Sequence, residues 1–78
     1  MTKVYLQSAV AELERSMDWT SGVVFGLQQV AEHFESDSQE YQNTIAEIEK
    51  LYKVQEASVR ARVGLLEAIE LLDEKEQE

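Results

Sequence analysis

The chain has 78 residues, with 16 acidic and 7 basic side chains, a formal net charge of −9, and no cysteine or proline. A single domain of this length removes only about 60% of its unfolded surface from water, too little to enclose the large pocket of most enzymes. The missing cysteine excludes disulfides, thiolate metal sites and a cysteine nucleophile, and the acidic balance argues against nonspecific binding to nucleic acid.

The sequence carries no signal for a membrane or for secretion. Its N-terminal segment has no apolar core of signal-peptide length, and its longest apolar runs are far shorter than the roughly 20 residues that span a bilayer. We therefore expect a soluble, cytoplasmic protein with no membrane partner. Hydrophobic residues make up 44% of the chain, which is ordinary for a globular protein and argues against wholesale disorder.

The first half of the chain has a regular apolar stripe with alternating steps of four and three residues. Its members are Leu6, Val10, Leu13, Met17, Thr20, Val24, Leu27, Ala31 and Phe34. This heptad spacing predicts one helix over residues 2–35. A break or bend near residues 18–22 is the alternative, because Gly22 costs a helix interior about 1 kcal/mol. We favour the continuous helix, since the heptad phase resumes on schedule at Val24.

A short loop and a second helix are predicted next. Residues 36–38 are polar, and Asp37 is placed to cap a helix while Glu40 reaches back in a capping box. Residues 39–73 contain no proline and predict the second helix. The acidic tail, residues 74–78, has no apolar side chain and is expected to fray.

Two long helices joined by a short loop predict one domain over residues 1–78, an all-α antiparallel two-helix hairpin with coiled-coil-like packing. With the turn near residues 37 and 38, the numbers of opposite residues sum to about 75. Thr20 then faces Gln55, and a buried polar pair of this kind would fix the register.

Charge is distributed unevenly and sums to −7, +3 and −5 over residues 1–49, 50–66 and 67–78. The hairpin sets the basic segment beside acidic side chains of the first helix, and we expect Arg62 to reach Glu12 or Glu14. We interpret the segment as a solvated face with cross-helix pairs rather than as a partner contact.

The chain has more apolar surface than a two-helix hairpin can bury in one stripe per helix. The residues that we expect at a protein interface are Trp19, Val23, Phe25, Val30, Val63, Leu66, Ile69 and Leu72. Because a contiguous exposed apolar patch usually marks an interface and the core of a hairpin is thin, this surplus predicts association with itself as a four-helix bundle, or with another protein. A three-helix fold, with a break near Thr20, is the self-contained alternative.

Two glycines have the spacing of close helix packing. Gly22 and Gly26 lie four residues apart, and we expect them to admit a bulky side chain, such as Tyr52 or a residue of a partner.

We find no signature of catalysis, of a cofactor site or of a metal site. His33 is the only histidine, and although Asp37 follows it at i+4, no Glu-x-x-His pattern accompanies them. Ser36 and Ser38 lack the glycine pattern of a nucleophile elbow, and no phosphate-binding loop is present. We therefore expect no enzymatic activity, no cofactor and no small-molecule ligand.

The segment Asp37-Ser38-Gln39-Glu40-Tyr41-Gln42-Asn43, a polar turn followed by Tyr-Gln, precedes the spaced apolar residues Ile45, Ile48 and Leu51. Mainly over residues 37–60, the chain resembles the small YscE/SsaE-type co-chaperones of bacterial type III secretion. The resemblance implies pairing with a helical-repeat co-chaperone, and a joint role in holding the needle subunit unpolymerised in the cytosol. Many members have a proline in the turn and a shorter first helix, which this chain lacks.

The sequence thus favours a protein-binding module, with a secretion co-chaperone as the first hypothesis. The alternative is a small homodimeric helical bundle with a regulatory or structural role, such as a phage-encoded inhibitor of a host protein. A third hypothesis is an acidic mimic of nucleic acid.

Overall fold

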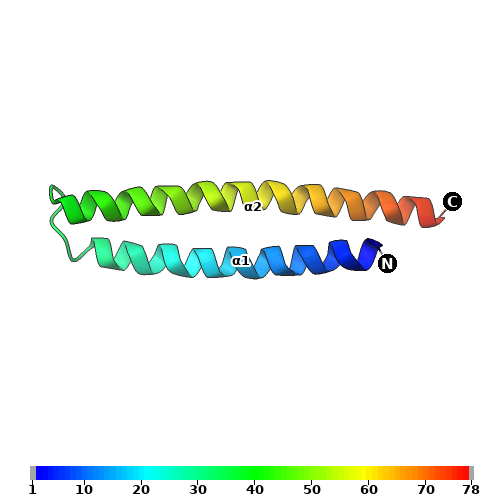
Figure 1. The fold of residues 1–78 in the computed structure, drawn as a ribbon, viewed down its shortest axis with the longest axis horizontal. Helices are drawn as coiled ribbons and strands as arrows, with labels where there is room; N and C mark the ends of the chain where they lie inside the picture. The colour runs from blue at the N-terminus through cyan, green and yellow to red at the C-terminus, as the bar shows by residue number, and fades with distance from the viewer. Residues whose placement is uncertain (1, 78) are drawn as a thin grey trace.

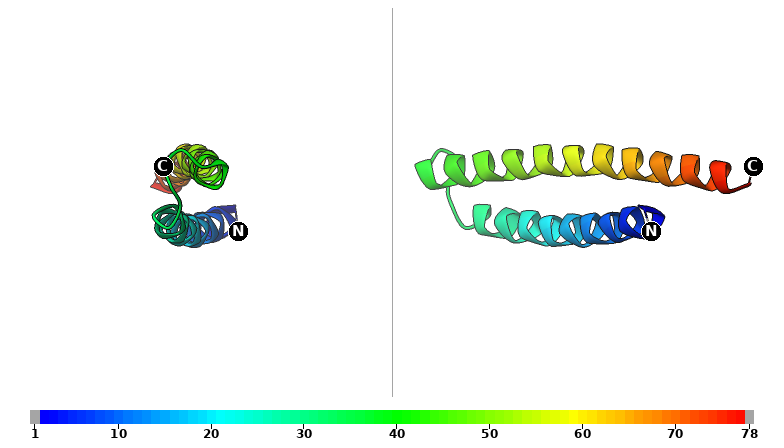
Figure 2. Two further views of the ribbon diagram at one scale, coloured as in Figure 1. Left: turned by 90° about the vertical axis from the view of Figure 1, so that its left-hand side faces the viewer. Right: turned by 45° about the vertical axis from the view of Figure 1, so that its right-hand side comes forward.

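The computed structural model describes residues 2–77, which form two antiparallel helices lying side by side (Figure 1). Helix α1 spans Thr2–Ala31 and helix α2 spans Gln39–Gln77, so α2 extends past the first residue of α1 at the open end of the hairpin. The end-on view shows the two helices winding slightly about each other, as in a coiled coil (Figure 2). The predicted all-α antiparallel hairpin is confirmed.

Helix α1 runs without a break through Gly22. The stripe of alternating steps faces α2, and within it Thr20, Val24 and Ala31 are buried, with Val24 only 6% exposed. A uniform heptad phase keeps every stripe residue on the same side of a helix, which compensates for the weak helix propensity of one glycine. The continuous helix is confirmed, and the three-helix alternative is wrong.

The end of α1 comes earlier than predicted, at Ala31 rather than near Glu35. The amides of His33 and Phe34 donate to the carbonyls of Val30 and Ala31 at 3.0 and 3.1 Å, and this i to i−3 spacing tightens the last turn. The connecting segment is therefore residues 32–38. Phe34, predicted to continue the stripe, lies in this connection and is exposed.

Ser38, and not Asp37, caps the second helix. The amide of Tyr41 donates to Ser38 Oγ at 3.1 Å, and Ser38 Oγ itself donates to the carbonyl of Glu35 at 2.6 Å. Because Gln39 is the first helical residue, Ser38 occupies the capping position and Asp37 stands one residue outside it. The predicted cap is therefore one residue too early, and the capping box with Glu40 is wrong, because Tyr41 stands three residues after Ser38.

The C-terminal end of α2 also differs from the prediction. The helix continues to Gln77, so residues 74–77, which were expected to fray, are helical. Glu78 lies outside the described residues.

Contacts across the hairpin define its register. Gln55 Nε2 donates to Ser21 Oγ at 2.9 Å, Arg62 Nε donates to Glu14 Oε1 at 3.0 Å, and Lys3 forms an ion pair with Asp73. In each of these pairs the residue numbers sum to 76, close to the predicted value. The expected contact between Arg62 and Glu14 is confirmed.

The predicted polar pair at mid-length is wrong in its partners. Thr20 is 4% exposed, but its hydroxyl donates to the carbonyl of Ser16 in its own helix at 2.8 Å. Threonine can donate its hydroxyl hydrogen in this way one turn back along a helix, and this hydrogen is then not available to a residue of α2. Gln55 bonds instead to the neighbouring Ser21.

We call the stripe of α1 and the residues of α2 that face it the seam. On α2 these residues follow the same spacing of four and three, and all of them are buried or half-buried. They are Tyr41, Thr44, Ile48, Leu51, Gln55, Ser58, Arg62, Leu65, Ile69 and Leu72. Four of these are polar. Among the described residues only Val24, Ala31 and Ile48 form a buried apolar core, and no side chain there is completely enclosed. The hairpin is held by a narrow seam.

We predict that Val24→Ala lowers the free energy of unfolding by about 2 kcal/mol more than Val59→Ala does. Both changes raise helix propensity equally, but Val24 is 6% exposed and Val59 is 49% exposed. Urea titrations followed by circular dichroism measure the difference. Equal stabilities for the two variants would show that the seam is not where the structure places it.

The cap gives a second prediction. Ser38→Ala should destabilise the protein by about 1 kcal/mol, because the amide of Tyr41 loses its acceptor. Asp37→Ala, one residue away, should change stability by less than about 0.5 kcal/mol. Thermal unfolding of both variants tests the assignment, which a larger loss in the Asp37 variant would contradict.

Candidate protein-binding surfaces

The seam divides the remaining surface into two faces, on opposite sides of the plane that contains both helix axes. In an antiparallel pair, residues that flank the seam on one side of α1 lie beside residues that flank it on the same side of α2. The hydrogen bond between Gln28 Nε2 and Tyr52 OH, at 3.1 Å, marks one of these sides. Helical periodicity then assigns the other outward residues to one face or the other.

The first face, which we call the acidic face, combines an apolar row with carboxylates. Its apolar members are Val4, Ala11 and Phe25 of α1 and Ile45, Tyr52, Val59, Val63 and Leu66 of α2. Among the described helical residues, its ionisable members are Glu14, Asp18, Glu49, Glu56, Glu70 and Asp73. Arg62 and Lys3, from the edge of the seam, already pair with Glu14 and Asp73. The charge that this face offers to a partner is therefore negative.

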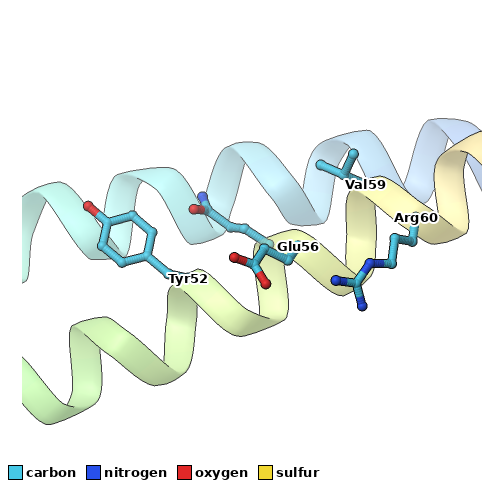
Figure 3. A pocket seen from close by; sticks show the side chains of 5 residues that line it. Tyr52, Glu56, Val59 and Arg60 are labelled. Atoms are coloured by element: carbon cyan, nitrogen blue, oxygen red, sulfur yellow. The ribbon is translucent and has the colours of Figure 1, made fainter.

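Two adjoining hollows lie on the acidic face and share Val59. One, of about 440 Å³, is lined by Tyr52, Gln55, Glu56, Val59 and Arg60, and the other, of about 360 Å³, by Glu14, Met17, Asp18, Val59 and Arg62. Figure 3 shows the lining residues of the first along α2, with the ring of Tyr52 directed toward α1. Both hollows are open to solvent, so they suit side chains of a docked protein better than an enclosed substrate.

The opposite side, which we call the uncharged face, has no ionisable side chain over its central part. Its members are Ser16, Trp19, Val23, Gly26 and Val30 of α1 and Val54, Ala57, Ala61, Gly64, Ala68 and Leu71 of α2. Trp19 is 69% exposed. The nearest charges along the same side are neutralised within each helix by the pairs Glu12–Arg15 and Glu47–Lys50. Such depletion of charge is typical of the core of a protein interface.

The residues predicted at an interface do not form one patch. Ile69 and Leu72 lie in the seam between the helices. The other six are divided between the two faces: Trp19, Val23 and Val30 lie on the uncharged face, and Phe25, Val63 and Leu66 lie on the acidic face.

Sequence reasoning missed several exposed apolar residues, namely Tyr52, Val54, Val59 and Leu71. A signal exists for two of them, because Tyr52 and Val59 recur with Leu66 at intervals of seven residues, the repeat of a second stripe beside the seam.

The glycines face open space. A β-carbon built at Gly22, Gly26 or Gly64 meets no atom within 4 Å, apart from each glycine's own immediate surroundings in its helix. The expectation that Tyr52 packs against Gly22 and Gly26 is therefore wrong, because Tyr52 lies on the acidic face and Gly26 on the other. Nothing inside the hairpin requires these residues to be glycine.

The rest of the described chain offers little chemistry. Within it, no group of three or more His, Cys, Asp or Glu side chains is arranged to hold a metal ion, and His33 is exposed in the connection after α1. Neither described helix is long and apolar enough to cross a membrane. The basic segment is partly engaged, with Lys50 paired to Glu47 at 3.0 Å and Arg62 paired to Glu14.

Comparison of the chain with protein-family models, curated proteins and solved structures gives no match. These comparisons do not identify the co-chaperone family that residues 37–60 resemble. The function has to be argued from the two faces themselves.

Proposed function

We propose that this chain is a non-enzymatic protein-binding module whose acidic face receives an amphipathic helix of a partner protein. The observation that carries the proposal is the row of Tyr52, Val59 and Leu66, which are 45%, 49% and 39% exposed. The charged side chains around this row are mainly carboxylates, with Arg60 and Arg62 at the hollows beside Val59. An exposed apolar row with a seven-residue repeat is the surface against which a helix packs in the helix-in-groove mode of recognition. The partner helix would place apolar side chains on this row and Lys or Arg beside the carboxylates.

The shape of the hairpin supports the need for a partner. It exposes 6001 Å², whereas a compact monomer of 8.9 kDa is expected to expose about 4,800 Å². Its radius of gyration is 18.0 Å, against about 11.5 Å for a compact domain of this length. Large apolar side chains, such as Trp19, Phe25 and Leu71, contribute to this exposed surface, so covering them adds stability that one seam does not supply.

The charges favour a basic partner over a neutral or acidic one. The chain has a net charge of −9, and complementary charge accelerates encounter and sets the orientation of docking more than it raises affinity. In this proposal the hollows beside Val59 receive apolar side chains and supply most of the affinity. Glu56 and Asp18, at the rims of the two hollows, attract and align the basic residues.

The resemblance of residues 37–60 supports a finer form of the proposal. In that form the chain is a cytoplasmic co-chaperone of type III secretion, its partner is a helical-repeat chaperone, and the pair keeps the needle subunit unpolymerised. The homodimeric bundle is a second candidate, and it is favoured by a different observation, the absence of charge on the opposite face.

A pair of peptides tests recognition by the acidic face. The first is a helical peptide of about three heptads with Leu at the apolar positions and Lys at the flanking positions, and the second carries Glu in place of Lys. We expect the Lys peptide to bind the wild-type chain, and the Glu peptide to bind at least about tenfold more weakly. Fluorescence anisotropy of labelled peptides measures both affinities.

Two matched variants separate docking from simple charge attraction. Val59→Asp and Val54→Asp add the same charge to the same helix at residues that are each 49% exposed, but on opposite faces. Val59→Asp should weaken binding of the Lys peptide by about tenfold, because a carboxylate replaces an apolar contact, whereas Val54→Asp should leave it unchanged. Attraction by net charge alone would strengthen binding to both variants equally, and that result would overturn the proposal.

A further inference from the structure

We propose that the uncharged face is a self-association surface, on which a second copy of this chain packs face to face to form an antiparallel four-helix bundle. The proposal goes beyond binding of a partner helix, because it uses the opposite side of the hairpin and requires no other protein. The two faces can be occupied at the same time.

The distribution of charge favours the uncharged face over the acidic face as the contact between two copies. Two identical chains associate most simply about a two-fold axis, which brings the same surface of each copy together. Two acidic faces placed against each other would oppose like charges, and desolvating them would be costly. The uncharged face avoids this repulsion although the chain as a whole carries −9, because its central residues have no ionisable group.

The outward residues of the uncharged face, together with the charged residues Glu12 and Lys50 at its margins, are complementary in size. Because the numbers of the Ser21–Gln55, Glu14–Arg62 and Lys3–Asp73 pairs each sum to 76, Trp19 of α1 stands at about the height of Ala57 of α2. By the same register, Gly26 stands at the height of Lys50, and Glu12 at the height of Gly64. At each of these heights one helix presents a large side chain and the other a small residue.

In a dimer whose two-fold axis runs parallel to the helices, each of these size-matched pairs occurs twice. It lays α1 of each copy antiparallel on α2 of the other copy at the same height. Each Trp19 ring then packs on Ala57 of the second copy, and the stem of Lys50 packs over Gly26 of the second copy. Further along, Tyr5 meets Leu71, and both are largely exposed in the single chain. The arrangement therefore covers the side chains of Trp19, Tyr5 and Leu71, which are 69%, 66% and 60% exposed in the single chain.

The glycines gain a role in this arrangement. A glycine in a helix interior costs about 1 kcal/mol relative to alanine, and the open space above Gly26 and Gly64 shows that the single hairpin gains no packing from them. In the bundle these spaces become recesses for side chains of the second copy.

The area is close to that of a stable dimer. The two helices lie side by side over the 30 residues of α1, about 45 Å. With a width of 15 Å, this part of the face covers about 700 Å² per chain, against the roughly 800 Å² per partner of a standard stable interface. Depletion of charge and an exposed tryptophan near the centre are features of interface cores with high affinity.

Molar mass and tryptophan fluorescence test the proposal. At tens of micromolar, light scattering of the wild-type chain should give twice the monomer mass of 8.9 kDa. Emission from Trp19, the only tryptophan, should shift to longer wavelength on dilution as the ring returns to water. Val54→Asp should give the monomer mass, while Val59→Asp should remain dimeric. A monomeric wild-type chain, or a dimer lost only with Val59→Asp, would overturn self-association through this face.

Disulfide trapping covers the case in which Val54→Asp fails to fold. The chain has no cysteine, so conservative single substitutions report contacts without background. In an equimolar mixture of Ser16→Cys and Ala61→Cys chains, oxidation should give a disulfide-linked heterodimer, because these positions meet at one height across the two-fold axis. Preferential linkage of like chains would overturn the arrangement. Failure of these tests leaves the peptide experiment on the acidic face unaffected, so the two proposals stand or fall separately.

Discussion

Two helices that pack against each other can bury only one seam, and every other feature of this molecule depends on that limit. The buried apolar core consists of Val24, Ala31 and Ile48. Through the middle of α2 the seam is polar, and there Gln55 and Arg62 hold the helices together by a hydrogen bond and an ion pair to α1. Exposed hydrogen bonds and ion pairs contribute little net stability. Burial of the apolar side chains outside the seam would therefore raise the free energy of unfolding above that of the single hairpin.

Both outer faces carry exposed apolar side chains, and the two faces differ in their charge. On the acidic face, Tyr52, Val59 and Leu66 stand near several carboxylates, which keep that face solvated and match the basic helix that we propose as its partner. On the uncharged face, Trp19 and Val54 have no such protection. In a chain with a net charge of −9, like charges therefore oppose contact between two acidic faces, and this repulsion is absent from the centre of the uncharged face. Both proposals follow from this division, and neither requires a catalytic group or a bound cofactor.

The sequence was sufficient for the features that depend on periodicity. Alternating steps from Leu6 to Ala31 predicted a helix unbroken at Gly22, because every stripe residue must keep one phase to reach the same seam. The position of the turn predicted the register, and the register predicted that Arg62 reaches Glu12 or Glu14, of which the structure shows Glu14. These features are properties of long segments, so an error of one residue does not alter them.

Features decided by a single residue were harder to predict. Asp37 and Ser38 are both good caps, and the choice between them depends on where the first helical turn closes. Thr20 and Gln55 were expected to meet, but the sequence does not show that a threonine hydroxyl will turn back to its own helix. The candidate interface residues were grouped as one surplus, because only the placement of the seam reveals that Trp19 and Phe25 lie on opposite faces.

The central claim is that one seam is not enough and that association through the outer faces completes the fold. The midpoint of urea unfolding, followed by circular dichroism over about a hundredfold range of chain concentration, tests this most directly, since linkage makes the stability of a folded dimer depend on concentration. The account predicts a midpoint that rises with concentration. A midpoint that is high and independent of concentration would show that the single hairpin is stable alone, and would contradict it.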